Sequence, residues 1–383
     1  MKNITEIFKD IKTPAYVLDE AKLIKNLETA KRLKTEANCK IVLALKGFSM
    51  FAIFPLIREY LDGTTASGFN EAMLGYETFG KEVHTYSPAY TEEDIEKLIP
   101  ISNHLSFNTI SQLEKFYQKI KSQNKNLHIG LRVNPLLSLV KNSEMYNPCS
   151  PCSRLGENIE NINDALFEKI SGLHFHILCE NLAEDSIKMI DEIEAKFSQY
   201  FRKISWINFG GGHYINHPDY NLEKLISRVK NFKNKYPHIE VIFEPGGAIA
   251  YDAGWLVASV LDVVRNQKNI LILDTSATAH MPDVIEMPYR PRVINSGLSN
   301  EKKYTYLMGG NTCLSGDIIG EYSFDKEVKA GDKIIFEDMM QYTMVKNTTF
   351  NGIALPDIAI LRKNGDYEIV KSFNYQDFKM RLS

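Results

Sequence analysis

The sequence lacks a long apolar segment and a strong charge of either sign. No run in its 383 residues approaches the length of a membrane-spanning helix, and the first ten residues lack the continuous apolar core of a signal peptide. The 45 basic and 48 acidic side chains give a net charge of -3, too weak a field to attract nucleic acid or an anionic membrane. We therefore expect a cytoplasmic protein without nucleic-acid or membrane partners.

Cysteine is scarce, and its number, five, is odd, which does not suggest a disulfide framework. Cys149 and Cys152 form a C-x-x-C pair, but no second cysteine pair or histidine pair stands nearby to complete a tetrahedral zinc site. Pro148 and Pro151 indicate a loop, whereas a redox motif opens a helix after a strand. We expect no bound metal and no redox function for this pair.

Short apolar runs alternate with amphipathic stretches between residues 41 and 245, a pattern typical of repeated strand-helix units. Helical spacing is clear over residues 70–79 and 110–120. Eight such units predict a (β/α)8 barrel of the TIM type, an α/β fold. The eight runs begin near Ile41, Gly63, Glu82, His104, Leu127, Gly172, Ile204 and Ile239.

The chain changes character after residue 244. Residues 255–265, 269–274, 333–337 and 352–362 are strand-like and are joined by turns such as Asn364-Gly365. The segment 15–19, which precedes the barrel, is strand-like as well. We predict a barrel over residues 21–248 and a β-rich domain that combines residues 249–383 with residues 1–20.

Polar side chains repeatedly follow the predicted barrel strands, and barrels of this kind build their sites at the carboxyl ends of the strands. Lys46 is the most informative of them, because an amine at the end of a buried strand loses its proton through desolvation and becomes a nucleophile toward a carbonyl group. A lysine that only extends its ammonium group to solvent is the alternative. The other residues of this kind are Asn108, Arg132, Asn134, His174, His176, Gly210-Gly211-Gly212 and Glu244.

The glycine run Gly210-Gly211-Gly212 suits an anion, because its backbone N–H groups can approach a phosphate closely. It lacks the G-x-G-x-x-G spacing of a dinucleotide site, and a plain tight turn is the alternative. In Glu244-Pro245-Gly246-Gly247 a carboxylate stands beside further glycine amides. This combination suits a phosphorylated heteroaromatic cofactor whose ring nitrogen the carboxylate keeps protonated, although a salt-bridged glutamate before a turn would look the same.

Strand alternation places His174 and His176 on one face and Phe175 on the other. One imidazole could pack against a planar cofactor, and the position at the strand end favours His176. The alternative is a core histidine satisfied by hydrogen bonds.

Together these motifs resemble the pyridoxal-phosphate decarboxylases of barrel fold, the relatives of alanine racemase that include ornithine and diaminopimelate decarboxylases. The resemblance rests on Ala44-Leu45-Lys46, Leu131-Arg132-Val133, His174-Phe175-His176, Gly210-Gly211-Gly212, Glu244-Pro245-Gly246 and Cys313. It is strongest to the branch that decarboxylates carboxynorspermidine and carboxyspermidine, through Tyr146-Asn147-Pro148-Cys149, Ser153-Arg154-Leu155-Gly156, His176-Ile177-Leu178-Cys179-Glu180, Asp274-Thr275-Ser276-Ala277, His280-Met281-Pro282-Asp283 and Met287-Pro288-Tyr289-Arg290-Pro291.

The resemblance implies a lyase that uses pyridoxal 5'-phosphate and acts as a homodimer with shared active sites. Lys46 would bind the cofactor covalently, His176 would stack on its ring and Glu244 would pair with its ring nitrogen. Cys313 would act in the neighbouring subunit's site as the proton donor. Residues near the phosphate would be Gly212, Gly246, Gly247 and Tyr342.

Departures from the better-known relatives bear on the substrate. Leu314 stands where ornithine and diaminopimelate enzymes have an acidic residue, and Glu286 stands where diaminopimelate enzymes have an arginine. Both favour a carboxylated polyamine, giving spermidine or norspermidine, with diaminopimelate decarboxylation and a non-catalytic cofactor carrier as alternatives. A cationic tail needs carboxylates to replace its hydration. The candidates for this role are Asp274, Asp283, Glu286 and Asp317.

Overall fold

The computed structural model describes residues 3–140 and 144–383. Two compact units divide the chain: Asn26–Ile249 form one, and Met1–Lys25 together with Ala250–Ser383 form the other. The boundaries predicted from the sequence, after residues 20 and 248, lie near these divisions. That these divisions are the domain boundaries stays a prediction.

Residues Asn26–Ile249 form a closed barrel of eight parallel strands, in the order β5-β4-β3-β2-β10-β9-β8-β6. Pairing of β5 with β6 closes the ring. The predicted barrel is thus confirmed, and every strand begins within two residues of its predicted start. The strands are β2 (Lys40–Ala44), β3 (Gly63–Ala66), β4 (Glu82–Tyr86), β5 (His104–Phe107), β6 (His128–Asn134), β8 (Gly172–His174), β9 (Trp206–Asn208) and β10 (Glu240–Phe243).

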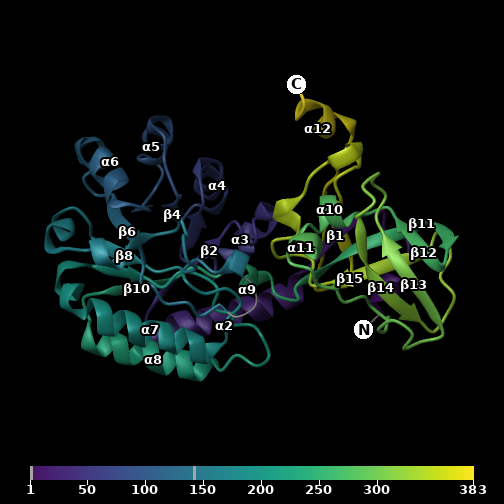
Figure 1. Cartoon of the computed structure of the whole chain (residues 1–383), viewed down its shortest axis with the longest axis horizontal. Helices are drawn as coiled ribbons and strands as arrows, with labels where there is room; N and C mark the ends of the chain where they lie inside the picture. Colours follow the sequence, from purple (N-terminus) through teal and green to yellow (C-terminus); the bar gives the residue numbers. More distant parts are fainter. Residues whose placement is uncertain (1–2, 141–143) are drawn as a thin grey trace. The chain divides into compact units, whose positions relative to one another are not determined.

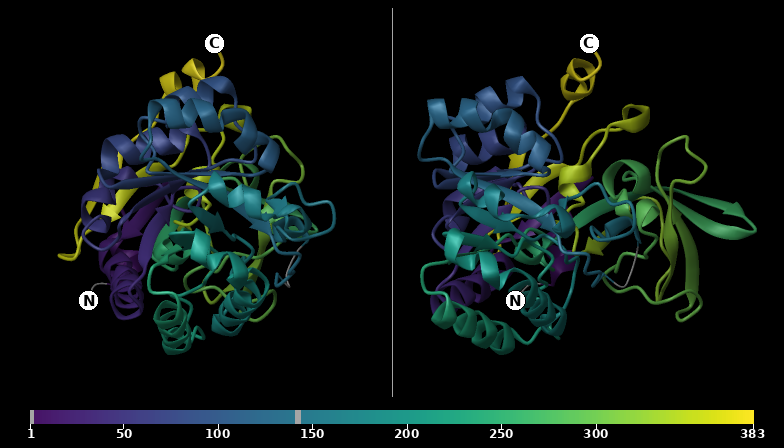
Figure 2. Two further views of the ribbon diagram at one scale, coloured as in Figure 1. Left: turned by 90° about the vertical axis from the view of Figure 1, so that its left-hand side faces the viewer. Right: turned by 60° about the vertical axis from the view of Figure 1, so that its left-hand side comes forward.

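Helices surround this barrel, as Figures 1 and 2 show. Their apolar faces pack inward: α7 buries Met189, Ile190 and Ile193, and α8 buries Val229 and Phe232. The described part of the β6–β8 connection instead contains the two-residue strand β7 (Glu157–Asn158) and turns of 3-10 helix. The barrel helices are α2 (Glu20–Ala37), which spans the division between the units, α3 (Phe54–Ile57), α4 (Phe69–Leu74), α5 (Glu92–Leu98), α6 (Ile110–Gln123), α7 (Ala183–Phe197), α8 (Leu222–Lys235) and α9 (Gly247–Ala250).

Trp206 fills the barrel interior near the amino-terminal ends of the strands. It packs with Val42 and Ile242 in a buried cluster. Two glycines on neighbouring strands make room for the indole: a Cβ on Gly130 or on Gly172 would lie 2.3 Å or 2.1 Å from its ring atoms. This end of the barrel is therefore a packed core.

The other unit is built on an eight-stranded sheet in the order β14-β13-β12-β11-β1-β16-β17, with β15 paired to β11. The N-terminal strand lies in the middle of this sheet, antiparallel to β11 and parallel to β16. Its predicted place in the β-rich unit is thereby confirmed. The strands are β1 (Ala15–Asp19), β11 (Gly254–Asn266), β12 (Lys268–Leu273), β13 (Tyr304–Gly309), β14 (Ile318–Phe324), β15 (Lys333–Glu337), β16 (Asp357–Leu361) and β17 (Tyr367–Lys371).

The core of this unit includes Phe8, Val17 and Trp255, and the rings of Phe8 and Trp255 meet edge to face. The far part of β11 is exposed and carries Leu261, Val263 and Val264. Figure 2 shows this β11–β12 hairpin reaching out from its sheet. The short helices of the unit are α1 (Ile4–Ile7), α10 (Ala277–His280), α11 (Asp283–Glu286) and α12 (Tyr375–Met380). Among the helices of the described residues, none combines the length and the apolar character needed to cross a membrane.

Candidate active site

Lys46, His176 and Glu244 come together at the carboxyl-terminal end of the barrel. Each follows a different strand, namely β2, β8 and β10. Lys46 Nζ lies 3.4 Å from His176 Nε2, and His176 Nδ1 lies 3.8 Å from Glu244 Oε2. The sequence placed these three residues on one rim, and the structure brings their side chains into one cluster.

Lys46 lies in the turn that ends β2, where Gly47 N–H donates to the Ala44 carbonyl. Desolvation, reinforced by the positive charge of Arg132, lowers the pKa of the Lys46 amine. Only the neutral amine is nucleophilic, so a lower pKa raises the fraction of Lys46 that can react. The lowered pKa and the contact with His176 favour a reactive amine over a solvated surface lysine, and the role of Lys46 stays a prediction.

The hydrogen bonds of His176 indicate its tautomer. Gly211 N–H donates to His176 Nδ1 at 3.1 Å, so the neutral ring carries its proton on Nε2, the atom that faces Lys46. Desolvation and the nearby Lys46 charge hold the pKa of His176 well below its usual value. A neutral imidazole with a fixed orientation results, and its position is set by the glycine turn after β9.

Glu244 is buried, with 5% of its surface exposed. Asn208 Nδ2 donates to Glu244 Oε1 at 2.7 Å, and His174 Nε2 lies 3.3 Å from Oε2. Burial opposes ionisation, but the contact with His174 outweighs it and holds the pKa of Glu244 well below its usual range. The site thus contains a buried carboxylate that stays charged.

Glycine is required where the loops of the site meet. A Cβ on Gly47 would lie 2.7 Å from the Gly247 nitrogen, and one on Gly246 would lie 2.9 Å from the Ala44 carbonyl oxygen. Gly212 has φ +82°, a left-handed conformation, and its Cβ would lie 2.1 Å from the Leu178 carbonyl oxygen. The predicted phosphate glycines of the barrel unit are therefore held in narrow turns beside Lys46 and Glu244.

Two residues that received no role from the sequence pattern position the site. Arg132, on β6, donates to the carbonyl of His176 at 2.8 Å and lies over the Tyr86 ring at 4.6 Å. Asn208, the last residue of β9, binds Glu244 and also accepts from Gly210 N–H at 2.8 Å. The available signal was the same for both, a polar residue at the carboxyl end of a barrel strand.

A comparison with protein families matches residues 15–340 to the pyridoxal-dependent decarboxylases, in a model described as the C-terminal sheet domain. The match covers most of the chain. The chain belongs to this family. It is therefore a pyridoxal-dependent carboxy-lyase, and its cofactor is pyridoxal 5'-phosphate.

Several members of this family are similar over nearly the full length. A carboxynorspermidine/carboxyspermidine decarboxylase from Campylobacter jejuni is 43% identical, over 98% of this chain and 99% of its own. A carboxyaminopropylagmatine decarboxylase from Synechocystis is 41% identical, over 97% of this chain and 95% of its own. The crystal structure of carboxynorspermidine decarboxylase complexed with norspermidine from Campylobacter jejuni has a TM-score of 0.89, with 42% identity, over 97% of this chain and 100% of that chain.

The barrel residues of this decarboxylase fit pyridoxal phosphate chemically. Lys46 would supply a half-buried amine of lowered pKa for the aldehyde, and Glu244 would supply a buried carboxylate for the ring nitrogen. The tightly packed turns at Gly212 and Gly246 would offer backbone N–H groups to its phosphate. His174 also belongs to this cluster: with His176 and Glu244 it has one ligand atom from each side chain within 4.8 Å of the others, a spacing that could hold a metal ion as well.

Two further predicted site residues of the β-rich unit lie in loops. They are Cys313 and Tyr342. Cys313 is exposed, and its backbone N–H donates to Asn351 Oδ1 at 2.7 Å. Leu314 beside it is 43% exposed. Tyr342 has φ +49°, an uncommon conformation for a residue with a side chain. Their roles toward cofactor and substrate stay predictions.

The four predicted substrate carboxylates have partners within the β-rich unit. Asp274 accepts from Thr13 Oγ1 at 2.6 Å and from Ser259 N–H at 2.8 Å. Asp283 and Glu286 both form ion pairs with Lys346. These contacts give each group a structural role that the sequence did not reveal, and contact with substrate stays a prediction for all of them.

Asp317 is the most enclosed of the four, with 3% of its surface exposed. It accepts from Ser276 Oγ at 2.9 Å, from Ala277 N–H at 2.8 Å and from Thr312 Oγ1 at 2.7 Å. A carboxylate with this many donors around it has little remaining capacity for a substrate cation.

Proposed function

We propose that the protein decarboxylates carboxyspermidine, carboxynorspermidine or both at the α-carbon, giving spermidine or norspermidine. The observation that carries the proposal is the clustering of Lys46, His176 and Glu244 at one end of the barrel, in a chain 43% identical to a carboxynorspermidine/carboxyspermidine decarboxylase. Norspermidine in the similar crystal structure supports a polyamine substrate.

The roles follow from the contacts. Lys46 would hold the cofactor through its amine, while His176 and Glu244 would orient and polarise the ring. When bound, pyridoxal phosphate accepts the electron pair that remains on the α-carbon as carbon dioxide leaves. Cys313 then gives its thiol proton to the α-carbon as general acid. Full steady-state turnover by a Cys313→Ala variant would contradict that last role.

Asp283 and Glu286 are the better candidates for the cationic tail of the substrate. Their side chains are 19% and 47% exposed, and they share one cation, Lys346, whose side chain is 30% exposed. A substrate ammonium group could exchange with this lysine without uncovering a buried charge. A Glu286→Arg variant should raise KM for carboxyspermidine by about tenfold or more, since a like charge repels the tail.

Carboxyaminopropylagmatine is the second candidate substrate, favoured by the Synechocystis relative at 41% identity. Its tail ends in a guanidinium group where the polyamines end in an ammonium group. Diaminopimelate is disfavoured, because Leu314 cannot recognise a distal polar group and Glu286 would repel a distal carboxylate. A non-catalytic cofactor carrier is disfavoured by the complete β-rich unit.

The deciding experiment measures carbon dioxide release by the purified holoenzyme, with its bound cofactor verified by absorbance. Carboxyspermidine, carboxynorspermidine, carboxyaminopropylagmatine and diaminopimelate are supplied separately. The proposal expects the highest kcat/KM for one of the first two. Preference for carboxyaminopropylagmatine would establish the second candidate, and a cofactor-loaded protein inert toward all four would overturn the enzymatic proposal.

We also propose a homodimer with shared active sites and a cytoplasmic location. The exposed apolar residues of the β11–β12 hairpin support association, since a strand with both faces exposed gains burial from a partner. All five cysteines are free thiols, as a reducing compartment would keep them.

A further inference from the structure

A second group of titratable side chains lies at the opposite end of the barrel from Lys46. It consists of Glu82, His84 and His104, and we refer to it as the histidine cluster. Glu82 and His84 come from the start of β4, and His104 is the first residue of β5. The proposed reaction uses none of these residues, so their placement needs another explanation.

The strand register stacks the imidazoles. His84 pairs with His104 between β4 and β5, and His104 pairs with His128 between β5 and β6. The rings of His84 and His104 stack at 4.1 Å, and those of His104 and His128 at 4.7 Å. Three adjacent strands thus present three imidazoles in a row.

Two of these imidazoles have unused nitrogen atoms. His84 and His104 are 3% and 4% exposed, and the buried Nδ1 atom of each has no hydrogen-bond partner among the residues that the structure describes. Leaving a buried polar atom unpaired costs about 1 to 3 kcal/mol. A ligand that accepts nitrogen lone pairs would remove this cost, and a transition metal is such a ligand.

The spacing of the histidine cluster approaches that of a metal site. One ligand atom from each of Glu82, His84 and His104 lies within 4.8 Å of the others. Glu82 Oε2 accepts from His84 Nε2 at 3.0 Å, which leaves the lone pair of that ring on the unpaired Nδ1 atom. Ligand atoms around tetrahedral zinc stand about 3.3 Å apart. Glu82 is the most accessible of the three, with a side chain that is 31% exposed, so it can adjust to an ion more easily than the buried imidazoles.

An open hollow gives an ion access to the histidine cluster. Its volume is about 330 Å³, and Glu82, His104 and His128 are among the residues that line it. Lys40 also lines it and pairs with Glu82 at 2.6 Å and with Glu240 at 3.0 Å. The Lys40 ammonium group opposes a cation beside Glu82. If Glu82 binds a metal, however, Lys40 still has Glu240 as an ion-pair partner.

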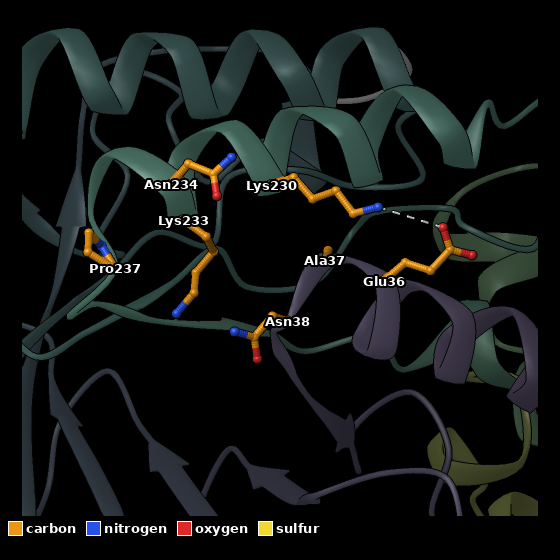
Figure 3. A pocket seen from close by; sticks show the side chains of 7 residues that line it. All are labelled: Glu36, Ala37, Asn38, Lys230, Lys233, Asn234 and Pro237. Atoms are coloured by element: carbon orange, nitrogen blue, oxygen red, sulfur yellow. Dashed lines mark ion pairs between the residues drawn. The ribbon is translucent and has the colours of Figure 1, made fainter.

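A neighbouring hollow lacks comparable features. It lies beside the ends of α2 and α8, has a volume of about 480 Å³ and is shown in Figure 3. Lys230 pairs with Glu36 there, and Lys233 donates to the Ile239 carbonyl. Both cations are already engaged, so this hollow offers no prepared site for an anion.

We propose that Glu82, His84 and His104 bind a divalent transition metal such as Zn²⁺ at the amino-terminal end of the barrel, with His128 able to complete the coordination. The metal would join β4 to β5 and so stabilise the barrel away from the reaction. This proposal differs from the expectation of no bound metal. That expectation rested on the pair Cys149 and Cys152, and the sequence does not show that the strand register brings the three histidines together.

The test titrates chelator-treated holoenzyme with Co²⁺, whose visible d–d absorption reports coordination geometry, followed by competition with Zn²⁺. Bound cofactor occupies the cluster of His174, His176 and Glu244, which could otherwise bind metal as well. We expect one equivalent of Co²⁺ per chain in a tetrahedral spectrum and a higher Tm with metal. Glu82→Gln and His104→Asn should weaken binding by more than about 100-fold.

Two further variants make the result specific. His217→Asn, at a partly exposed histidine elsewhere in the barrel unit, should bind Co²⁺ as the wild type does. Lys40→Gln should bind about tenfold more tightly, because it removes the opposing charge, and misfolding would not produce a tighter site. The proposal is wrong if the wild type shows no Co²⁺ band, or if Glu82→Gln and His104→Asn bind the ion as tightly as the wild type.

Discussion

Glu244 combines full burial with a retained negative charge, and this makes it the most sensitive single position of the site. We predict that Glu244→Gln lowers kcat by about 100-fold or more, because the isosteric amide leaves the ring nitrogen without an anionic partner. Cofactor absorbance and steady-state kinetics measure the effect. Glu192→Gln, on the outer helix α7, is the matched control, and an equal loss in both variants would contradict this role.

Asp338 gives a pH dependence that can be measured separately from activity. Desolvation raises the pKa of this carboxyl group from 3.8 to about 7, against the opposing hydrogen bond from Asp252 N–H. Between these two pH values the folded protein holds a proton that the unfolded chain has lost, so the free energy of unfolding falls as pH rises through that window.

We predict that Asp338→Asn flattens this slope and makes the protein more stable than the wild type at pH values above about 7. Asparagine also suits the φ of +58° at this position. Urea unfolding at a series of pH values measures the difference. Asp262→Asn, on the exposed part of β11, should leave the slope unchanged, and an unchanged slope in Asp338→Asn as well would refute the assignment.

At the residue scale, position along the chain was enough to place Lys46, His176 and Glu244 at one end of the barrel, because each lies within two residues of the end of a recognisable strand. The sequence could not show that Gly211 N–H fixes the tautomer of His176, since that contact joins two loops 35 residues apart. Nor could it show that Lys346 neutralises Glu286, because ion pairing depends on which loops meet.

At the scale of the element, the turn after β9 has no room for a side chain at Gly212. We predict that Gly212→Ala destabilises the holoenzyme by about 2 to 3 kcal/mol, through its φ of +82° and a clash with the Leu178 carbonyl. Gly68→Ala, at a glycine with open space around its Cβ position and an extended φ of 177°, should change stability by less than about 0.5 kcal/mol. Urea unfolding compares them, and equal effects would show that the turn tolerates a side chain.

The start of α10 depends on Asp317, which accepts from the backbone N–H groups of Ala277 and Thr278. We predict that Asp317→Asn lowers the free energy of unfolding by about 2 kcal/mol. The amide NH2 group of asparagine is itself a donor, so it would leave some of the donors around Asp317 unpaired. Thermal unfolding and KM are measured together. An unchanged Tm with a raised KM would instead identify Asp317 as a substrate ligand.

Element by element, the barrel strands were predictable because buried parallel strands are short apolar runs that recur with helices between them. The β-rich unit was predicted less completely: β13, β14 and β17 were missed. Strand β14 mixes exposed and buried residues, and β17 has no buried residue, so neither shows a continuous apolar run. Residues 75–79, expected to continue an α-helix, form a π-helix, in which Gly75 lies against Thr64.

At the scale of the whole molecule, the proposed shared active site can be tested by mixing subunits. Lys46→Ala and Cys313→Ala should each be nearly inactive alone. If each site takes Lys46 from one subunit and Cys313 from the other, random reassociation should restore about a quarter of the wild-type activity, because half of the dimers are mixed and each has one intact site. Activity that stays at the level of the separate variants would contradict shared sites.

The two tryptophans of the chain divide evenly between its two units. Trp206 is packed against Gly130 and Gly172 within the barrel, while Trp255 lies in the core of the β-rich unit against Phe8. Each unit therefore contains its own intrinsic fluorophore. Replacing one indole at a time by phenylalanine would turn a fluorescence melt into two separate records, which would show whether the barrel and the sheet lose their structure together or in sequence.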